Sequence, residues 1–263
     1  MPVKVDYGVK QIQTLKGIDA IRLRPGMYIG SVGADGVWQI TLEILSNAID
    51  EYLVGECDYI KLQYLSNNGA LIVTDNGRGV PFGSAADGSE TLVNVYTKLH
   101  TGAKFDSTGK SGYNSSGGMN GVGAKATNAL SDRFEVTSIR DGKVAVATFN
   151  KGKLDKFTVQ KKAANIEYPV EHGTQVCFHP DPEIFKEDAK FDLDRLRKQV
   201  QELAYLSPGL KFLFCIDDKC EEIKSDRGLL DYLDVLTATK NRLTSVFAAE
   251  SQQDRMRVRL ALA

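Results

Sequence analysis

The segment from Val37 to Val54 constrains the fold most, because its residues predict one amphipathic helix with two distinct faces. The apolar face is formed at helical spacing by Leu42, Leu45, Ala48, Ile49 and Tyr52. Glu43, Asn47 and Asp50 follow at i, i+4 and i+7 and lie on a different face. Gly55 is the expected end of the helix. The fold must therefore bury one side of this helix and leave a carboxylate and an amide, one turn apart, on the other.

Shorter periodic segments predict the elements around this helix. Further helices are expected over residues 12–22, 91–99, 124–130, 191–206 and 228–236. Strands are expected over residues 59–65, 70–74, 134–139, 144–150, 156–160, 174–179 and 211–216, with a final hairpin over 246–249 and 256–263. Asn67-Asn68-Gly69 is a hairpin turn between the first two strands. Because the chain ends inside an apolar run, we expect a piece of a longer protein.

Composition limits the functional classes open to the chain. With 263 residues it can form one large domain, or one domain and part of another. It is 42% hydrophobic and 25% charged, which is typical of a soluble protein with a core. The net charge of −1 excludes a general electrostatic attraction to nucleic acid. Residues 1–10 lack an apolar signal segment and no run approaches the ~20 apolar residues of a membrane span, so we expect a cytoplasmic protein.

The cysteines point away from a metal centre. Cys57, Cys177, Cys215 and Cys220 are scattered and contain no C-x-x-C pair, and the three histidines are also dispersed. A zinc site is therefore a poor interpretation. In a cytoplasmic protein we expect all four to be reduced thiols, in the core or at the surface.

Glu43 and Asn47 are the first candidates for chemistry. A lone helical carboxylate is usually only solvated, but an asparagine inside a helix is mildly unfavourable and needs a reason. The Asn47 amide oxygen is a hard ligand that suits Mg²⁺. Glu43 beside it can hold a water molecule against a phosphate and accept its proton, which is worth roughly 10²–10⁴ in rate.

Asp75 is the second candidate, at the end of the apolar strand and before Gly77 and Gly79. An Asp-Asn-Gly sequence is commonly just a turn. Alternatively, Asp75 accepts a hydrogen bond from an exocyclic amine, such as that of adenine, and the glycines let a flat base approach the backbone.

Residues 102–123 form a glycine-rich stretch without periodicity, which indicates either disorder or a functional lid. Its end, Gly117 to Gly123, leads into a predicted helix, and backbone amides in that arrangement cradle phosphates. Lys104 and Asn120 could add a charge and an amide. Gly121 to Ala126 fits the Rossmann glycine pattern, but that pattern must follow a buried strand, and no strand is predicted before it. Gly109-Lys110-Ser111 ends like a Walker phosphate loop, but the first glycine of that loop would fall at position 104, which is lysine.

The order of these motifs resembles a known superfamily. E-x-x-x-N-A-x-D-E at 43–51, D-x-G-x-G-V-P at 75–81, G-G-x-x-G-V-G at 117–123 and Gly173-Thr174 are similar to the set of the gyrase, chaperone, histidine-kinase and MutL ATPases. The segments at 24–30, 99–105 and 128–131 narrow the resemblance to the ATPase subunits of type IIA DNA topoisomerases, that is gyrase B and its topoisomerase IV counterpart. It covers essentially the whole chain.

The resemblance implies an α+β fold, a two-layer sandwich in which a mixed, mostly antiparallel sheet carries helices on one face (the Bergerat-type ATP-binding fold). Residues 1–228 would form the ATP-binding domain with an N-terminal dimerisation arm, and residues 229–263 the beginning of a transducer domain. The transducer lysine that completes the phosphate site would lie beyond Ala263. We therefore expect ATP binding with weak hydrolysis.

The resemblance also implies a role for each motif. Glu43 would be the general base, Asn47 the Mg²⁺ ligand, and Asp75 the acceptor for the adenine amine. Gly79 and Thr174 would assist Asp75 through water, and Arg78 and Glu51 would pair over the adenine. Tyr113, Asn120 and the glycine cluster would cover ribose and phosphates, Lys104 would contact phosphate, and Tyr7 would reach the partner subunit's nucleotide. The implied nucleotide-binding set is Asn47, Asp50, Glu51, Asp75, Arg78, Gly79, Val80, Pro81, Lys104, Tyr113, Gly117, Gly118, Met119, Asn120, Gly121, Val122, Gly123, Thr174 and Tyr7.

ATP would close a dimer of this chain and so gate the passage of one DNA duplex through another. The implied partners are a second copy, the DNA-cleaving A-type subunit, double-stranded DNA and aminocoumarins such as novobiocin, because Asp75 and Arg140 match the drug-contacting positions. Some residues depart from the bacterial gyrase pattern: Ser46, Asn76, Asn120 and Ala124-Lys125. A chaperone or mismatch-repair ATPase would share the pocket but not the segments at 24–30 and 99–105, and a histidine kinase would not need Glu43 as a base.

Overall fold

The computed structural model describes residues 17–99, 101, 121–162, 170–186, 189–239, 245–253 and 256–262. Within these ranges the helices are α1 (Ile18–Leu23), α2 (Gly26–Ile29), α3 (Ala34–Leu53), α4 (Thr91–Thr97), α5 (Gly123–Ala129), α6 (Leu193–Leu206) and α7 (Leu229–Thr237). The strands are β1 (Tyr59–Leu65), β2 (Ala70–Asp75), β3 (Ser131–Arg140), β4 (Lys143–Asn150), β5 (Lys153–Lys161), β6 (Gly173–Pro180), β7 (Lys211–Ile216), β8 (Lys219–Ile223), β9 (Phe247–Gln253) and β10 (Met256–Leu262).

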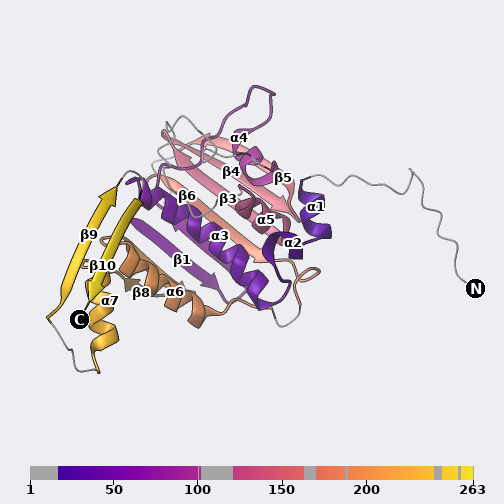
Figure 1. The fold of residues 1–263 in the computed structure, drawn as a ribbon. Helices are drawn as coiled ribbons and strands as arrows, with labels where there is room; N and C mark the ends of the chain where they lie inside the picture. Colours follow the sequence, from indigo (N-terminus) through magenta and orange to yellow (C-terminus); the bar gives the residue numbers. More distant parts are fainter. Residues whose placement is uncertain are drawn as a thin grey trace, which may run out of the picture.

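Eight strands form one sheet in the order β5-β4-β3-β6-β2-β1-β7-β8, and β9 and β10 form a separate hairpin. Strands β1 and β7 are parallel, and every other neighbouring pair in the sheet is antiparallel. The helices lie on one face of this sheet, with α3 running across its middle (Figure 1). The predicted two-layer α+β architecture, with a mixed and mostly antiparallel sheet, is confirmed.

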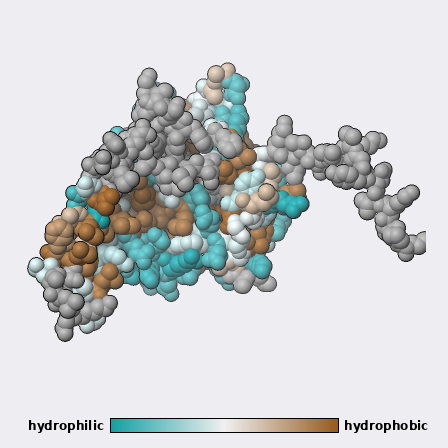
Figure 2. All heavy atoms as spheres, viewed as in Figure 1, coloured by the Kyte–Doolittle hydropathy of each residue, from teal (hydrophilic) through white to brown (hydrophobic). Residues whose placement is uncertain are grey.

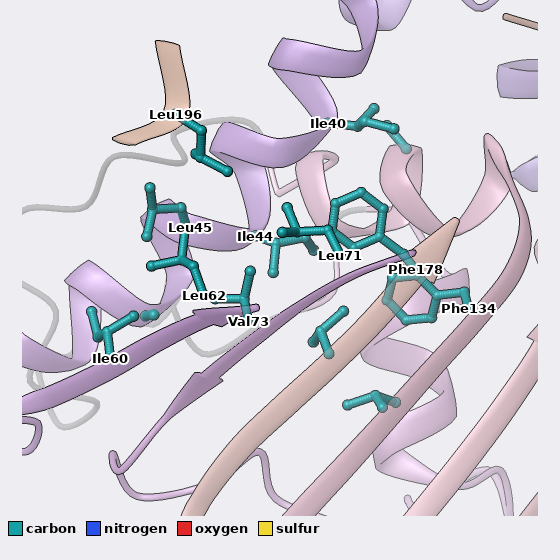
Figure 3. Packing of buried hydrophobic residues seen from close by; sticks show 14 of the residues in the cluster. Ile40, Ile44, Leu45, Ile60, Leu62, Leu71, Val73, Phe134, Phe178 and Leu196 are labelled. Atoms are coloured by element: carbon teal, nitrogen blue, oxygen red, sulfur yellow. The ribbon is translucent and has the colours of Figure 1, made fainter. Parts of the chain in front are cut away.

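The core lies between α3 and the sheet. Ile40, Ile44 and Leu45 of α3 are at most 3% exposed and point toward the strands. Figure 3 shows them facing buried side chains from four strands, which are Ile60, Leu62, Leu71, Val73, Phe134 and Phe178. Burying side chains of this size stabilises a fold by about 1.5–3 kcal/mol each. Of the predicted apolar stripe, Leu45 and Ala48 are buried, whereas Leu42, Ile49 and Tyr52 are only partly buried. The face that fixes α3 against the sheet is therefore turned toward Ile40 and Ile44, and the opposite face is left for the site.

Element boundaries differ from the sequence predictions in a few places. The long helix begins at Ala34 rather than Val37, because Gly33 in an extended conformation precedes its first turn. The helix from residue 91 ends at Thr97, and β3 extends from Ser131 to Arg140. Strand β8 was missed, because four of its five residues, Lys219 to Glu222, are exposed and only Ile223 is buried.

The expectation of four reduced thiols is wrong for two of them, because Cys215 and Cys220 form a disulfide. These residues are direct partners in the antiparallel register of β7 and β8, with Cα atoms 4.1 Å apart. The pairing could not be predicted without β8. Cys57 is a free, buried thiol and Cys177 a free, partly buried one. Burial raises the pKa of Cys57 to about 12, which keeps this thiol protonated and unreactive.

The last two strands carry a group of exposed apolar side chains. Val246, Phe247, Val258, Leu260 and Leu262 are each 40% exposed or more. Figure 2 shows this apolar surface over β9 and β10, while the surface near α6 is mostly hydrophilic. None of the helices in the described ranges combines the length and apolarity needed to cross a bilayer.

Candidate functional site

Asp75 is the last residue of β2 and is 7% exposed. It lies opposite Thr174 in the register of β2 and β6. Its Oδ1 accepts hydrogen bonds from the backbone N–H of Gly77, at 2.9 Å, and of Thr174, at 3.3 Å. Burial raises the pKa of Asp75 to about 7; the two N–H groups and His172 oppose the shift, whereas the negative charge of Glu51 adds to it. When ionised, a carboxylate can accept about four hydrogen bonds, and the two described here use only Oδ1.

Glycine is required at two positions after Asp75. A Cβ added to Gly77 would lie 2.7 Å from Cγ of Glu51 and 2.9 Å from Oδ1 of Asp75. Gly79 has φ of +73°, and a Cβ there would lie 2.8 Å from the carbonyl oxygen of Ile139. Since a side chain would clash at both positions, the glycines bring the backbone of this turn close to its neighbours.

Arg78 pairs with Glu51 of α3, as the resemblance implied. Its Nε and Nη2 donate to the two carboxylate oxygens of Glu51 at 3.0 and 2.9 Å, and its backbone N–H donates to Oε2 at 3.0 Å. The side chains are 32% and 13% exposed. A two-pronged pair of this kind is directional, so it ties the turn after β2 to α3.

The carbonyl groups of the same turn are held from the opposite side. Ser138 Oγ donates to Val80 O at 2.7 Å, and Arg140 Nη1 donates to Gly79 O at 3.3 Å. The Nδ1 atom of His172 lies 2.7 Å from Gly77 O. Sequence reasoning missed Ser138 and His172 because neither belongs to a linear motif; they reach the turn only through the order of the strands.

Gly173 explains why a glycine precedes Thr174. Its φ is +136°, and a Cβ on this residue would lie 2.0 Å from the carbonyl oxygen of Asp75. Only glycine lets β6 approach the end of β2 this closely. That approach brings the Thr174 N–H to the Asp75 carboxylate.

Glu43 lies two turns before Glu51 on α3, beside the start of α5. Gln39 Nε2 donates to Glu43 Oε1 at 2.8 Å. A Cβ on Gly123, the first residue of α5, would lie 1.8 Å from Glu43 Oε2. The carboxylate therefore lies directly against the N-terminal turn of α5. Thr127 fixes the two helices together, because its Oγ1 donates to Ile40 O at 3.0 Å.

Asn47 is partly buried one turn after Glu43. Asp50 is 1% exposed and belongs to the buried side of α3, so the prediction that it shares a polar face with Glu43 and Asn47 is wrong. Across the described ranges, no group of three or more His, Cys, Asp and Glu side chains is placed to hold a metal ion. Asn47 itself offers one amide oxygen, and Mg²⁺ prefers oxygen ligands and takes only one or two from a protein when phosphates and waters supply the others.

Apart from Asp50, the described candidates form two groups. Glu51, Asp75, Arg78, Gly79, Val80 and Thr174 gather at the end of β2, and Pro81 is exposed beyond them. Glu43, Asn47, Val122 and Gly123 lie where α3 meets α5, and Gly121 precedes them with φ of +58°. Seven candidates lie outside the described residues, namely Tyr7, Lys104, Tyr113, Gly117, Gly118, Met119 and Asn120.

One departure from the bacterial pattern has a structural explanation. Asn76 Oδ1 accepts from the backbone N–H groups of Asp58 and Tyr59 at 3.1 and 3.0 Å, and its Nδ2 donates to Asp58 Oδ1 at 2.6 Å. The amide therefore joins the turn after β2 to the start of β1. This joint uses the Asn76 side chain as both acceptor and donor, and an ionised carboxylate at position 76 could only accept.

Comparison with known proteins agrees with this geometry. The family of histidine kinase-, DNA gyrase B- and HSP90-like ATPases matches residues 33–184, more than half of the chain. The chain belongs to this ATPase family. Its relatives include the B subunit of DNA gyrase from Thermotoga maritima, 40% identical over 243 residues, which are 91% of this chain and 37% of the relative. The B subunit of DNA topoisomerase 4 from Mycoplasma pneumoniae is 38% identical over 259 residues, 96% of this chain and 39% of the relative.

A solved structure of the same ATPase family has the same fold. It is the 43K ATPase domain of Thermus thermophilus gyrase B in complex with an aminocoumarin, with a TM-score of 0.79 and 32% identity, covering 94% of this chain and 62% of that one. The chain thus spans little more than a third of the curated relatives named above. The resemblance to type IIA topoisomerase ATPase subunits is confirmed, and the chaperone and mismatch-repair alternative is not favoured.

Proposed function

We propose that this chain binds and hydrolyses ATP as the N-terminal part of the ATPase subunit of a type II DNA topoisomerase. The observation that carries the proposal is the buried Asp75, whose carboxylate accepts two backbone N–H groups and keeps further acceptor capacity at the end of β2. Glu43 lies eight residues from Glu51 along α3, which corresponds to about 12 Å. One extended nucleotide can therefore contact Asp75 with its base and the Glu43 region with its phosphates.

In this proposal Asp75 binds the exocyclic amine of adenine. The glycines at 77 and 79 bring this turn against Glu51 and Ile139 at the end of β2, and a flat base would lie beside the backbone of the turn. Thr174 and Gly79 assist through water, and the pair of Arg78 with Glu51 borders the base. Ionised Asp75 is the acceptor, and since the pKa of Asp75 is about 7, affinity should fall below neutral pH.

Hydrolysis is assigned to Glu43. Its Oε1 is held by Gln39, and the carboxylate accepts a proton from the water that attacks the terminal phosphorus. Gly123 brings the N–H groups of the first turn of α5 close to the same place, where they favour the negative charge of phosphates. Mg²⁺ held by Asn47 would supply neutralisation of phosphate charge.

The function of the whole protein follows from the relatives and remains part of the proposal. ATP binding would close a dimer of two copies, with Tyr7 of one copy reaching the nucleotide of the other. Closure would gate the passage of a DNA duplex in cooperation with a DNA-cleaving A-type subunit, in the cytoplasm. In this scheme residues 1–228 are the ATP-binding domain and residues 229–263 begin the transducer domain.

Aminocoumarins are proposed ligands of the same site. The related Thermus thermophilus structure is a complex with an aminocoumarin. Here Asp75 and Arg140 both contact the turn that begins at Gly77, through Gly77 N and Gly79 O. Novobiocin should therefore compete with ATP. Simultaneous binding of both would remove this part of the proposal.

Calorimetric titration with a non-hydrolysable ATP analogue and Mg²⁺ tests the proposal. The parent chain should bind, and Asp75→Ala should weaken binding by about 10–100-fold, because it removes a hydrogen bond to a charged group. Asp155→Ala on exposed β5 is the matched control and should bind as the parent does. Equal binding by parent and Asp75→Ala would show that the base lies elsewhere. In a separate assay with ATP, transfer of the terminal phosphoryl group to a protein side chain would favour a kinase.

A further inference from the structure

The hairpin of β4 and β5 is strongly basic in a chain that is otherwise acidic. Residues 143–162 contain six lysines and one acidic residue, Asp155, which gives this segment a net charge of +5. Since the whole chain has a net charge of −1, its remaining residues together carry −6. A chain without a general attraction to polyanions therefore has one segment that attracts them.

Four of the six lysines form no ion pair within the part of the chain that the structure describes. Lys151 pairs with Glu183 at 2.5 Å, and Lys162 pairs with Glu171 at 2.6 Å. The other four are exposed, and they are Lys143, Lys153, Lys156 and Lys161. We call these four lysines the basic edge, because β5 is the outermost strand on its side of the sheet.

The opposite edge of the same sheet is built differently. Lysines on edge strands commonly prevent pairing with another chain, and this is the simplest explanation of the basic edge. On β8, however, Glu221 pairs with Arg197 at 2.6 Å and Glu222 pairs with Lys211 at 2.8 Å. That edge is protected with charges that are balanced by ion pairs. Edge protection alone therefore does not account for the excess positive charge on β5.

The strand register places two of the lysines where they repel each other. Lys143 and Lys161 are direct partners in the antiparallel pair of β4 and β5. Like charges directly opposite one another in a sheet are destabilising. An anion bound beside this pair would remove that cost, so the arrangement favours a negatively charged ligand.

The lysines approach the free edge from both faces of the sheet. Lys156 lies opposite Thr148, whose neighbours Ala147 and Phe149 belong to the core under the helices. Because side chains alternate along a strand, Lys156 is on the face without helices. Lys161 is five residues further along β5 and so is on the other face. The positive charge thus follows the edge as a line and does not cover one flat face.

A line of charge fits the backbone of duplex DNA. Residues 153–161 extend over about 26 Å, given the rise of a strand. Duplex DNA carries one negative charge per about 1.7 Å of its axis, so one duplex can meet the whole basic edge. Lysine contacts phosphate as a point charge and reads no bases. Phe157, the one aromatic residue of β5, packs against the core, so the strand offers no platform on which unpaired bases could stack.

We propose that the basic edge binds the phosphate backbone of duplex DNA without sequence preference. The need for an anion follows from the charges, and the choice of DNA among polyanions rests on the proposed function. Three strands separate β5 from β2, which carries Asp75, so DNA and nucleotide bind at separate places. The basic edge holds the duplex on the ATP-binding part of the chain.

The test is the affinity of the chain for a labelled duplex of about 24 base pairs, measured by fluorescence anisotropy over a range of salt concentrations without nucleotide. The parent should show a slope of log K against log salt of about −3.6, that is about −0.9 for each of four phosphate contacts. The combined variant Lys153→Gln, Lys156→Gln and Lys161→Gln should reduce the slope by about 2.7 and weaken binding at low salt at least about tenfold.

The matched control removes the same number of positive charges elsewhere. Lys190→Gln, Lys198→Gln and Lys219→Gln change exposed lysines outside the β4–β5 hairpin, the last of them on β8. This variant has the same net charge as the first and should bind the duplex as the parent does. Equal losses in the two variants would show that only net charge matters and would overturn the proposal.

Asp155 allows a change in the opposite direction. It is the one acidic residue of the hairpin and is exposed beside Lys156. Asp155→Asn removes its repulsion of phosphate and should strengthen duplex binding by about twofold at low salt. Weaker binding by this variant would contradict the assignment of the duplex to this edge.

The remaining outcomes separate this inference from its alternatives. Parent binding to phosphatidylserine vesicles but not to the duplex would assign the edge to a membrane and overturn the proposal. Self-association of the β5 variant in sedimentation, with unchanged affinity for DNA, would reduce the lysines to edge protection. A parent that binds the ATP analogue but no duplex would overturn this inference and leave ATP binding standing, whereas duplex binding without analogue binding would count against the proposed function.

Discussion

The two ends of the candidate site are built differently. Around Asp75, groups from α3, β3 and the loop before β6 hold one short turn through side chains and backbone, including Glu51, Arg140 and His172. Around Glu43, the described contacts are the hydrogen bond from Gln39 and the close approach of Gly123. The first end is fixed by the folded sheet itself. The second depends on how two helix turns meet.

This difference suggests that base binding and hydrolysis can be separated. Changes at the Asp75 end should alter affinity and its pH dependence. Changes at the Glu43 end should alter turnover, because a carboxylate that accepts a proton from water is sensitive to small displacements. The predictions below test this division, beginning with the largest effect.

Glu43→Ala should lower single-turnover ATP hydrolysis by about 10²–10⁴-fold, because it removes the general base. Binding of a non-hydrolysable analogue should stay within about twofold of the parent, on the expectation that the base contacts carry most of the affinity. Glu56→Ala, beyond the end of α3, is the control. If binding and hydrolysis fell together, the two ends would not be separable.

Asp75→Asn should change the pH dependence of folding stability. The pKa of Asp75 is about 7 in the native chain and 3.8 as the reference for the unfolded chain, so the native state holds the proton more tightly. The parent should therefore lose unfolding free energy relative to the variant as pH rises from about 4 to about 7, by about 2–4 kcal/mol. Denaturant unfolding at pH 4.5 and pH 8 measures this. A difference independent of pH would contradict the buried-carboxyl account.

Gly123→Ala should slow hydrolysis by about 10²-fold, because the new Cβ would lie 1.8 Å from Glu43 Oε2 and must displace the carboxylate. Gly26→Ala is the control, since no atom lies within 4 Å of a Cβ at that position. Single-turnover hydrolysis and analogue binding are compared for both variants. Normal turnover by Gly123→Ala would show that the position of Glu43 is not critical.

The smallest effect is expected for Gln39→Ala. Loss of its hydrogen bond to Glu43 Oε1 should slow hydrolysis by about fivefold, which corresponds to about 1 kcal/mol, and leave analogue binding unchanged. Gln199→Ala on α6 serves as the reference substitution. A larger effect on analogue binding than on turnover would contradict the assignment of Gln39 to the hydrolytic end of the site.

Much of this molecule was predictable from local sequence. The helix carrying Glu43 and Asn47 has its own periodicity, and Asp75 ends a clear apolar strand within a hairpin. Contacts made by the sheet order were not predictable. His172 meets Gly77 across 95 positions, and Ser138 meets Val80 across 58, so no spacing rule connects them. Strand β8 lacks an apolar pattern, and the disulfide between Cys215 and Cys220 was missed with it.

The most direct test of the central claim is an experimental structure of this chain with Mg²⁺ and a non-hydrolysable ATP analogue. The account predicts the exocyclic amine of adenine within about 3.2 Å of the Asp75 carboxylate. It also predicts the terminal phosphate beside Glu43 and Gly123. An adenine bound away from Asp75, or a terminal phosphate remote from Glu43, would contradict it.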